Sequence, residues 1–323
     1  MRGFLNIDKP IGITSFDVVR AIRRASGVKR VGHAGTLDPL ATGVLPVAIG
    51  DATRLIDGLV DARKAYRAEV TLGVETPTDD AEAEHEATSR APDETVAALT
   101  TAAIELALAT FVGESMQLPP AFSAIKQAGQ PAYRAARRGE PLEIAPRPVV
   151  AHALRLIKRR GPVLVIEVEC GKGYYVRALA RDLGRALGVG GHVSALRRTR
   201  VGPFEAAQAV PLDVATEVLA ASRAGLPAAL DVLLHAPDAV LVGWPVIILD
   251  DVALSDVQMG RVVHPEPRPL SGVDTPPAVG LKARAYAADG ALAAIAEHQG
   301  DWDWHPVRVF APLEASASTP PEV

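Results

Sequence analysis

The stretch from Gly32 to Gly43, GHAGTLDPLATG, places a single carboxylate among glycines and a proline. Glycine accepts backbone conformations that other residues resist, and Pro39 keeps Asp38 out of the helical region. Asp38 is therefore predicted to lie on a rigid, exposed turn, where it could serve as nucleophile, general base or metal ligand. An aspartate that only shapes the turn fits the same residues. A metal is disfavoured because no second ligand is close in sequence.

A second glycine-rich turn, Gly171–Arg177 (GKGYYVR), leaves an expected strand and opens an expected helix. Its backbone N–H groups could face an anion, although its spacing is not that of a P-loop. Arg177, Arg181 and Arg185 follow one another at intervals of four residues, so they share one helix face. One of them could pair with a buried carboxylate. For Arg181 and Arg185 we favour a solvated basic stripe.

Aromatic residues make up only 4% of the chain, so their positions are informative. Tyr66 falls on the apolar side of an alternating segment, and Tyr175 lies in the second glycine-rich turn. A tyrosine can stack on a nucleic-acid base and offer its hydroxyl group, but each of these also fits ordinary core packing. His33, beside glycines, could be a base, a phosphate contact or a turn residue.

The net charge of −4 is unevenly distributed over the 323 residues. Lys and Arg exceed Asp and Glu by 4 in residues 1–70 and by 9 in residues 111–210, whereas acidic residues are in excess by 8 in residues 71–110 and by 9 in residues 211–323. This pattern permits a polyanion-binding face on an acidic protein. The alternative is solvated surface charge, which is how we interpret the basic runs 158–160 and 197–200 when taken alone.

The composition is that of a globular protein, with 48% hydrophobic and 22% charged residues. A single cysteine, Cys170, excludes an intrachain disulfide and a thiolate zinc cluster. Apolar runs are too short to span a bilayer, and the N-terminus lacks a signal-peptide core. We therefore expect a cytoplasmic protein, a monomer, without a membrane partner.

Periodicity and turn residues predict an α/β (α+β) domain that ends near residue 238 and contains a long excursion at about 117–146. A small β-rich domain is expected at 239–312 and a disordered tail at 313–323. In the first domain we expect a helix that Ser15 caps and Gly27 ends, a helix that Asp51 caps, and an irregular acidic loop at 75–94. The other expected elements are strands at 44–49, 66–72, 149–157 and 163–170, and helices at 95–112 and 173–187.

These features leave two main hypotheses: an enzyme that acts on a nucleotide within RNA through Asp38, and a non-catalytic RNA-binding module whose Asp38 only shapes a loop. A small-molecule transferase is a weaker third. Together, however, the motifs resemble the bacterial tRNA pseudouridine synthase B (TruB) family, in family order from residue 5 to about 235. The resemblance rests on LNIDKPIGITS (Leu5–Ser15), Gly32–Gly43, KAYRA (Lys64–Ala68), the segment from Gln117 through Lys126 to Tyr133 and Arg137, Gly171–Arg177, and Leu196–Arg198.

The resemblance implies a mixed, largely antiparallel sheet flanked by helices, followed by a PUA-like domain. It implies conversion of uridine to pseudouridine at position 55 in the T-loop of tRNAs, with base flipping and without metal or other cofactor. The T-arm of tRNA would be the partner, and no guide RNA would be needed because the insertion resembles the stand-alone bacterial type. A non-catalytic RNA-binding or tRNA-folding module is the alternative.

Residue roles also follow from the resemblance. It makes Asp38 the nucleophile, Arg177 its ion-pair partner and Tyr66 the residue that stacks on the target uracil. Tyr175 and Leu196 would line the base pocket, His33 would help hold the flipped-out RNA, and Lys9 with Pro10 would support the catalytic loop. The segment Thr76–Asp80 departs from the family pattern by carrying Pro77 where Asp is usual.

Overall fold

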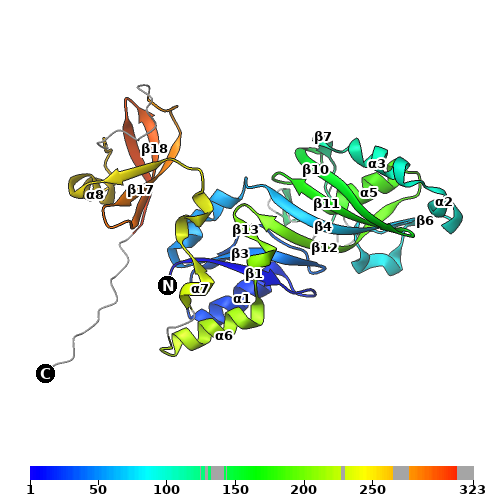
Figure 1. Cartoon of the computed structure of the whole chain (residues 1–323), viewed down its shortest axis with the longest axis horizontal. Coiled ribbons are helices and arrows are strands. Elements are labelled where there is room, and N and C mark those ends of the chain that lie inside the picture. Colours follow the sequence, from blue (N-terminus) through cyan, green and yellow to red (C-terminus); the bar gives the residue numbers. More distant parts are fainter. Residues whose placement is uncertain are drawn as a thin grey trace. The chain divides into compact units, whose positions relative to one another are not determined.

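The computed structural model describes residues 1–310 except 124, 128–129, 132–141, 143, 227–229 and 265–275. The tail predicted at 313–323, and Tyr133 and Arg137 of the insertion, lie outside the described residues. The chain divides into two compact units, Met1–Pro237 and Asp238–Val323, which Figure 1 colours from blue to red along the sequence.

A large mixed sheet, most of whose strand pairs are antiparallel, forms the centre of the first unit. Its strand order is β14-β1-β3-β12-β4-β11-β10-β7, and among the described residues only the β1–β14 and β3–β12 pairs are parallel. The predicted fold class is thus confirmed. The strands are β1 (Gly3–Lys9), β2 (Val31–His33), β3 (Ala41–Ile49), β4 (Lys64–Leu72), β7 (Gly113–Gln117), β10 (Arg147–Arg160), β11 (Val163–Cys170), β12 (Gly191–Val201), β13 (Phe204–Glu205), β14 (Val210–Pro211) and β15 (Leu234–His235).

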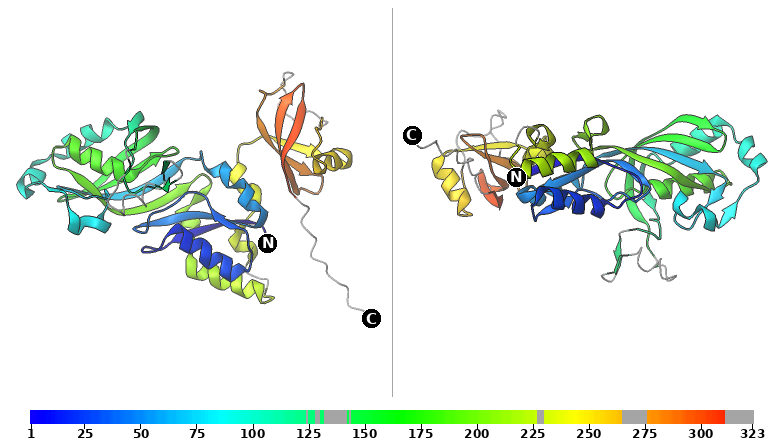
Figure 2. Two further views of the ribbon diagram at one scale, coloured as in Figure 1. Left: turned by 180° about the vertical axis from the view of Figure 1, so that it is seen from behind. Right: turned by 90° about the horizontal axis from the view of Figure 1, so that it is seen from below.

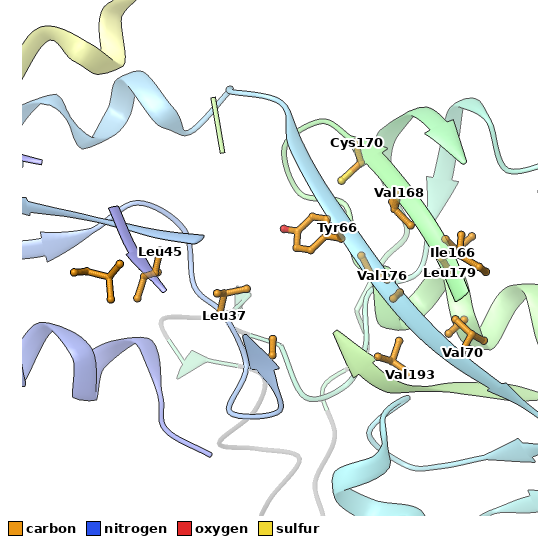
Figure 3. Packing of buried hydrophobic residues seen from close by; sticks show 14 of the residues in the cluster. Leu37, Leu45, Tyr66, Val70, Ile166, Val168, Cys170, Val176, Leu179 and Val193 are labelled. Carbon is orange, nitrogen blue, oxygen red and sulfur yellow. The ribbon is translucent and has the colours of Figure 1, made fainter. Parts of the chain in front are cut away.

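The expected alternation of strand β4 is confirmed, because Tyr66, Ala68, Val70 and Leu72 are all buried. Their side chains pack against β11 and helix α5 (Val176–Ala186), in the core that Figure 3 shows from close by. Helices α1 (Ser15–Ser26) and α6 (Leu212–Arg223) lie side by side at the β1 end of the sheet (Figures 1 and 2). Strands β4, β11 and β12 and helix α5 therefore form the frame around the second glycine-rich turn.

Helix α1 ends at Gly27, as predicted, but its N-cap is Thr14 and not Ser15. Thr14 and Asp17 form a capping box, in which Asp17 N donates to Thr14 Oγ1 at 3.1 Å and Thr14 N donates to Asp17 Oδ2 at 2.9 Å. The Ser15 hydroxyl group is buried and exchanges hydrogen bonds with the backbone of Leu37. The hydroxyl group expected to cap the helix thus binds the loop that carries Asp38 instead.

Two further helix predictions are wrong in detail. Asp51 caps no helix; it pairs with Arg30 at 2.8 Å, and η1 (Gly50–Leu59) is a 3-10 helix. The helix expected at 95–112 is two helices, α2 (Asp93–Ala98) and α3 (Thr101–Ala109). The break has a local cause, because the Thr100 hydroxyl caps α3 by accepting a hydrogen bond from Ala103 N at 3.1 Å.

The shorter elements of the first unit are η2 (Ala81–Glu86), η3 (Ala206–Gln208), α7 (Leu230–Leu233) and the strands β5 (Val74–Glu75), β6 (Ser89–Arg90), β8 (Lys126–Gln127) and β9 (Gln130–Pro131). The β5–β6 pair and η2 show that part of the segment expected to be irregular at 75–94 is ordered.

The second unit has a four-stranded sheet and its own small core around Ile247, Val257 and Trp304. Its elements are η4 (Pro237–Leu241), β16 (Val246–Leu249), α8 (Asp251–Gln258), β17 (Lys282–Ala287), β18 (Leu292–Gly300) and β19 (Asp303–Val309). The sheet fits the expected β-rich texture, and the PUA-like assignment stays a prediction. Among the described residues, no helix is both long and apolar enough to cross a membrane.

Candidate active site

The loop that carries Asp38 joins β2 to β3 and is fixed at several points. Ala41 N donates to Asp38 O at 3.0 Å, and Leu37 is bound through its backbone to Ser15. Gly43, just after the loop, has a φ of +97°, and a Cβ there would lie 2.2 Å from the carbonyl oxygen of Arg198. Only glycine allows β3 to approach β12 this closely, so the backbone at the base of the loop has little freedom.

Lys9 supports this loop from behind. Its ammonium group is buried and donates to the carbonyl oxygens of Pro10 at 2.9 Å, Ile13 at 2.6 Å and Pro39 at 3.4 Å. Burial lowers the pKa of Lys9 to about 8, although the nearby charge of Asp38 opposes the shift. The predicted supporting position of Lys9 and Pro10 thus has a structural basis, although neither residue lines the cavity described below.

Arg177 pairs with Asp38, with Nε lying 3.0 Å from Oδ2. Its guanidinium group is buried, and the remaining nitrogens are also bound. Nη1 donates to Thr78 O at 2.9 Å and lies 3.4 Å from Asp80 Oδ2, while Nη2 donates to Phe122 O at 2.9 Å. The arginine is therefore held in one orientation by three segments far apart in the sequence.

Burial raises the pKa of Asp38 above its ordinary value, and Arg177 opposes that rise. Asp80 adds to the rise, and Lys9 counteracts it. The positive charge of Arg177 thus favours the ionised form of Asp38, but burial outweighs this attraction and the pKa of Asp38 is raised. A carboxyl with a raised pKa is a stronger base and nucleophile than an exposed aspartate.

A cavity of about 290 Å³ adjoins the Asp38–Arg177 pair. The Tyr66 ring projects from β4 toward the loop that carries Leu37 (Figure 3), and burial raises the pKa of Tyr66, which keeps its hydroxyl group protonated. The cavity is lined by the predicted residues Asp38, Tyr66, Tyr175, Arg177 and Leu196, and by Gly35, Thr36, Leu37, Lys64, Ser123, Gly173, Tyr174, Val176 and Arg198.

His33 does not line this cavity. It ends strand β2 and is half-buried, with Nδ1 enclosed and without a hydrogen-bond partner. Burial lowers the pKa of His33, and the charge of Arg198 lowers it further. The imidazole is therefore neutral at neutral pH, which suits a hydrogen-bonding role better than an ionic phosphate contact.

Sequence reasoning missed the acidic partners of the helix α5 arginines. Asp79 and Asp80 are buried, although they fall in a segment expected to be a surface loop. The interpretation of Arg181 as part of a solvated stripe is wrong: Arg181 is buried, with Nη1 2.9 Å from Asp79 Oδ2. Arg185 pairs with Glu75 and is 56% exposed. The signal was available, because the four-residue spacing puts Arg181 on the face of Arg177.

Similarity to known proteins shows the family of this chain. A family model for the N-terminal domain of TruB family pseudouridylate synthases matches residues 23–176, and one for the C-terminal domain of tRNA pseudouridylate synthase B matches residues 177–242. A tRNA pseudouridine synthase B from Arthrobacter sp. is 42% identical, with 97% of both chains covered. The chain belongs to the TruB family of pseudouridylate synthases. The resemblance read from the motifs is thereby confirmed.

Another relative and a solved structure are also similar to this TruB family member. The tRNA pseudouridine synthase B of Aromatoleum aromaticum is 48% identical over 73% of this chain and 75% of its own. A solved structure of an H/ACA ribonucleoprotein bound to a substrate RNA containing 2′-deoxyuridine has a TM-score of 0.71 and 23% identity, covering 96% of this chain and 85% of that one. That structure shows a shared fold.

Arg198 of this TruB family member is another residue whose position charge alone does not predict, because the basic run 197–200, taken alone, indicates surface charge. It is 1% exposed and lines the cavity, where Nε donates to Val44 O at 2.7 Å and Nη2 to Gly35 O at 3.1 Å. Its neighbour Arg197 pairs with Asp8 through two hydrogen bonds of 2.8 and 3.0 Å. In the part of the chain that the structure describes, no group of three His, Cys, Asp or Glu side chains could hold a metal ion.

Proposed function

We propose that this protein converts uridine to pseudouridine at position 55, in the T-loop of tRNAs, with Asp38 as the reactive group. One observation carries the proposal: an Asp38–Arg177 pair adjoins a small cavity with the tyrosines Tyr66 and Tyr175 in its wall. Membership of the TruB family and the names of its relatives, tRNA pseudouridine synthase B, supply the reaction and the class of RNA.

The reaction breaks the C1′–N1 bond of uridine, turns the base, and joins C1′ to C5. The proton on C5 is released and N1 gains one, so atoms balance and nothing is oxidised or reduced. An ionised Asp38 could attack the sugar, attack the uracil ring or remove a proton, and each route uses the same carboxylate. Arg177 serves all three, because its contact with Oδ2 fixes the carboxylate and opposes the effect of burial on its pKa.

A target base inside a folded tRNA must first leave its stack, which costs about a few kcal/mol. Phosphate contacts with basic side chains of residues 1–70 and 111–210 would supply much of that free energy. In the cavity, the Tyr66 ring stacks on the uracil, and Tyr175 and Leu196 form the walls. His33, outside the cavity, helps to hold the flipped-out strand.

The test is incubation of the full chain with unmodified tRNA transcript, followed by mapping of carbodiimide-dependent stops in reverse transcription. We expect one new stop, at position 55, without any added guide RNA. A transcript with cytidine at that position is the matched control and should give none. Tight binding without any stop would instead support the non-catalytic tRNA-folding module.

A further inference from the structure

Arg181 joins two segments that flank the active site without itself lining the cavity. One is the acidic segment, residues 76–80, where Asp79 Oδ2 lies 2.9 Å from Arg181 Nη1. The other is the insertion root, residues 117–123, where Leu118 O accepts a hydrogen bond of 2.8 Å from Arg181 Nη2. Arg181 Nε is bound as well, 2.8 Å from Asp182 Oδ1. Every nitrogen of this buried guanidinium group is thus bound, and Nη1 and Nη2 hold the two distant segments.

Arg177 bridges the same two segments one helical turn earlier. It donates to Thr78 O in the acidic segment and to Phe122 O in the insertion root, both at 2.9 Å. Its Nε is the atom that contacts Asp38. The two arginines therefore act on a shared framework, and only Arg177 reaches the reactive carboxylate.

Gln117 adds a third connection between the insertion root and helix α5. Its buried amide group accepts from Tyr175 N at 2.9 Å and donates to Tyr175 O at 3.1 Å. The root is thus bound at its first residue, at Leu118 and at Phe122. A shift of the root would move the oxygen that holds Arg177 Nη2.

Arg181 also has an electrostatic effect on Asp79, in addition to its hydrogen bonds. Burial raises the pKa of Asp79, and Arg181 is the strongest opposing influence, followed by Arg177. Without Arg181, the buried Asp79 carboxylate would have Arg177 as its strongest remaining cation. Asp79 would then compete with Asp38 for the same guanidinium group.

Building on the proposed function, we propose that Arg181 is a positioning residue for turnover. It neutralises Asp79 and ties the acidic segment to the insertion root, so that Arg177 stays on Asp38.

Single-turnover rates at saturating full-length enzyme, together with tRNA dissociation constants, test this role. Arg181→Met should slow turnover by about tenfold or more, because small displacements of reacting groups are costly, and leave the dissociation constant within about threefold. Arg185→Met is the matched control on the same helix and should stay near wild type. Arg181→Lys should lie between them, since one ammonium group cannot satisfy both Asp79 and Leu118.

A pH profile separates this role from a merely structural one. Asp38 is faced by Arg177 on α5, by Lys9 on β1, and by Asp80 and Glu82 around the start of η2. The phenol groups of Tyr66 on β4 and of Tyr175 before α5 face it as well. If Arg177 is drawn toward Asp79, the pKa of Asp38 rises. The acid limb of the pH profile, where the single-turnover rate falls as pH decreases, then moves to higher pH. Combining Arg181→Met with Asp79→Asn should move it back and recover part of the rate, which a misfolded variant could not do.

Hydrogen–deuterium exchange provides a readout that needs no product. Arg181→Met should speed exchange in the insertion root and leave helix α1 unchanged, and Arg185→Met should alter neither. If wild-type protein makes no pseudouridine, the proposed function fails, and exchange still decides whether Arg181 positions the root. Unchanged rate, acid limb and root exchange in Arg181→Met would overturn the proposal.

Discussion

The ammonium group of Lys9 lies against the carbonyl oxygen of Pro39, the residue that follows Asp38 in the chain. Two other carbonyl oxygens, of Pro10 and Ile13, share the same Nζ atom. One buried cation therefore joins the end of β1, the turn before α1 and the Asp38 loop. The cost of that arrangement is visible in the lowered pKa of Lys9.

The Lys9 pKa predicts how stability changes with pH. Native Lys9 loses its proton near pH 8, whereas the unfolded side chain keeps it to about 10.4. Between these values the unfolded state binds more protons, so this group makes the free energy of unfolding rise with pH, by at most about 1.4 kcal/mol per unit. Urea unfolding of wild type and Lys9→Met across this range should show the difference growing in favour of wild type. A constant difference would contradict the assignment.

Asp38→Asn should remove turnover and leave tRNA affinity within about tenfold, because the amide keeps the shape of the turn but is a poor nucleophile and base. Single-turnover assays at saturating enzyme and filter binding of the same transcript measure the two quantities. Near-normal turnover by the Asn variant would remove Asp38 from the chemistry.

The single-turnover rate should fall in acid with an apparent pKa above the usual aspartate range. In the proposed function the ionised carboxylate is the active form, and burial raises the pKa of Asp38 against the opposing effect of Arg177. Rates measured with saturating enzyme, from acid to neutral pH, locate this limb. A limb at or below the value of an exposed aspartate would show that Arg177 outweighs burial.

Arg177 should matter more to turnover than Arg181, and Arg181 more than Arg185. Arg177→Ala leaves Asp38 and the buried Asp80 without their shared cation. Breaking a buried pair such as Arg177–Asp80 typically costs about 3–5 kcal/mol, whereas Asp38, whose side chain is 39% exposed, is partly compensated by water. Arg177→Lys should rescue poorly, because a lysine cannot reproduce contacts that three guanidinium nitrogens make. Single-turnover rates for the whole series rank the positions, and equal small losses at all three would refute the ordering.

The second unit lies within residues 211–323, where acidic residues are in excess by 9, so we expect it to make few phosphate contacts. A chain ending at Pro237 should bind tRNA modestly more weakly than the full chain. The slope of log K against log salt should hardly change, because each phosphate contact contributes about 0.7–0.9 to it. Measurement of tRNA binding over a series of salt concentrations compares the two proteins. A decrease in slope that corresponds to the loss of about three phosphate contacts would show that this unit binds the RNA backbone.

Local patterns were enough to predict much of the frame. The alternation at 66–72 is a period of two that only a half-buried strand satisfies, and Gly27 ends its helix through its own backbone freedom. The glycines and the proline around Asp38 indicated a constrained carboxylate, because these residues restrict the local backbone conformation. The Asp38–Arg177 pairing came from resemblance to the TruB family, since no local rule joins residues so far apart.

Tertiary structure decided which charges are buried and what faces them. Charge patterning alone put Arg181 and Arg198 at the surface, and both are buried because distant carboxylates and carbonyl oxygens satisfy their guanidinium groups. Asp79 is a similar case, because its sequence context suggests a solvated loop residue, whereas in the fold it is buried against Arg181 of α5. Sequence spacing determines which face a side chain occupies. Whether a charge on that face meets water or an opposite charge depends on long-range packing, and that packing sets the pKa of Asp38.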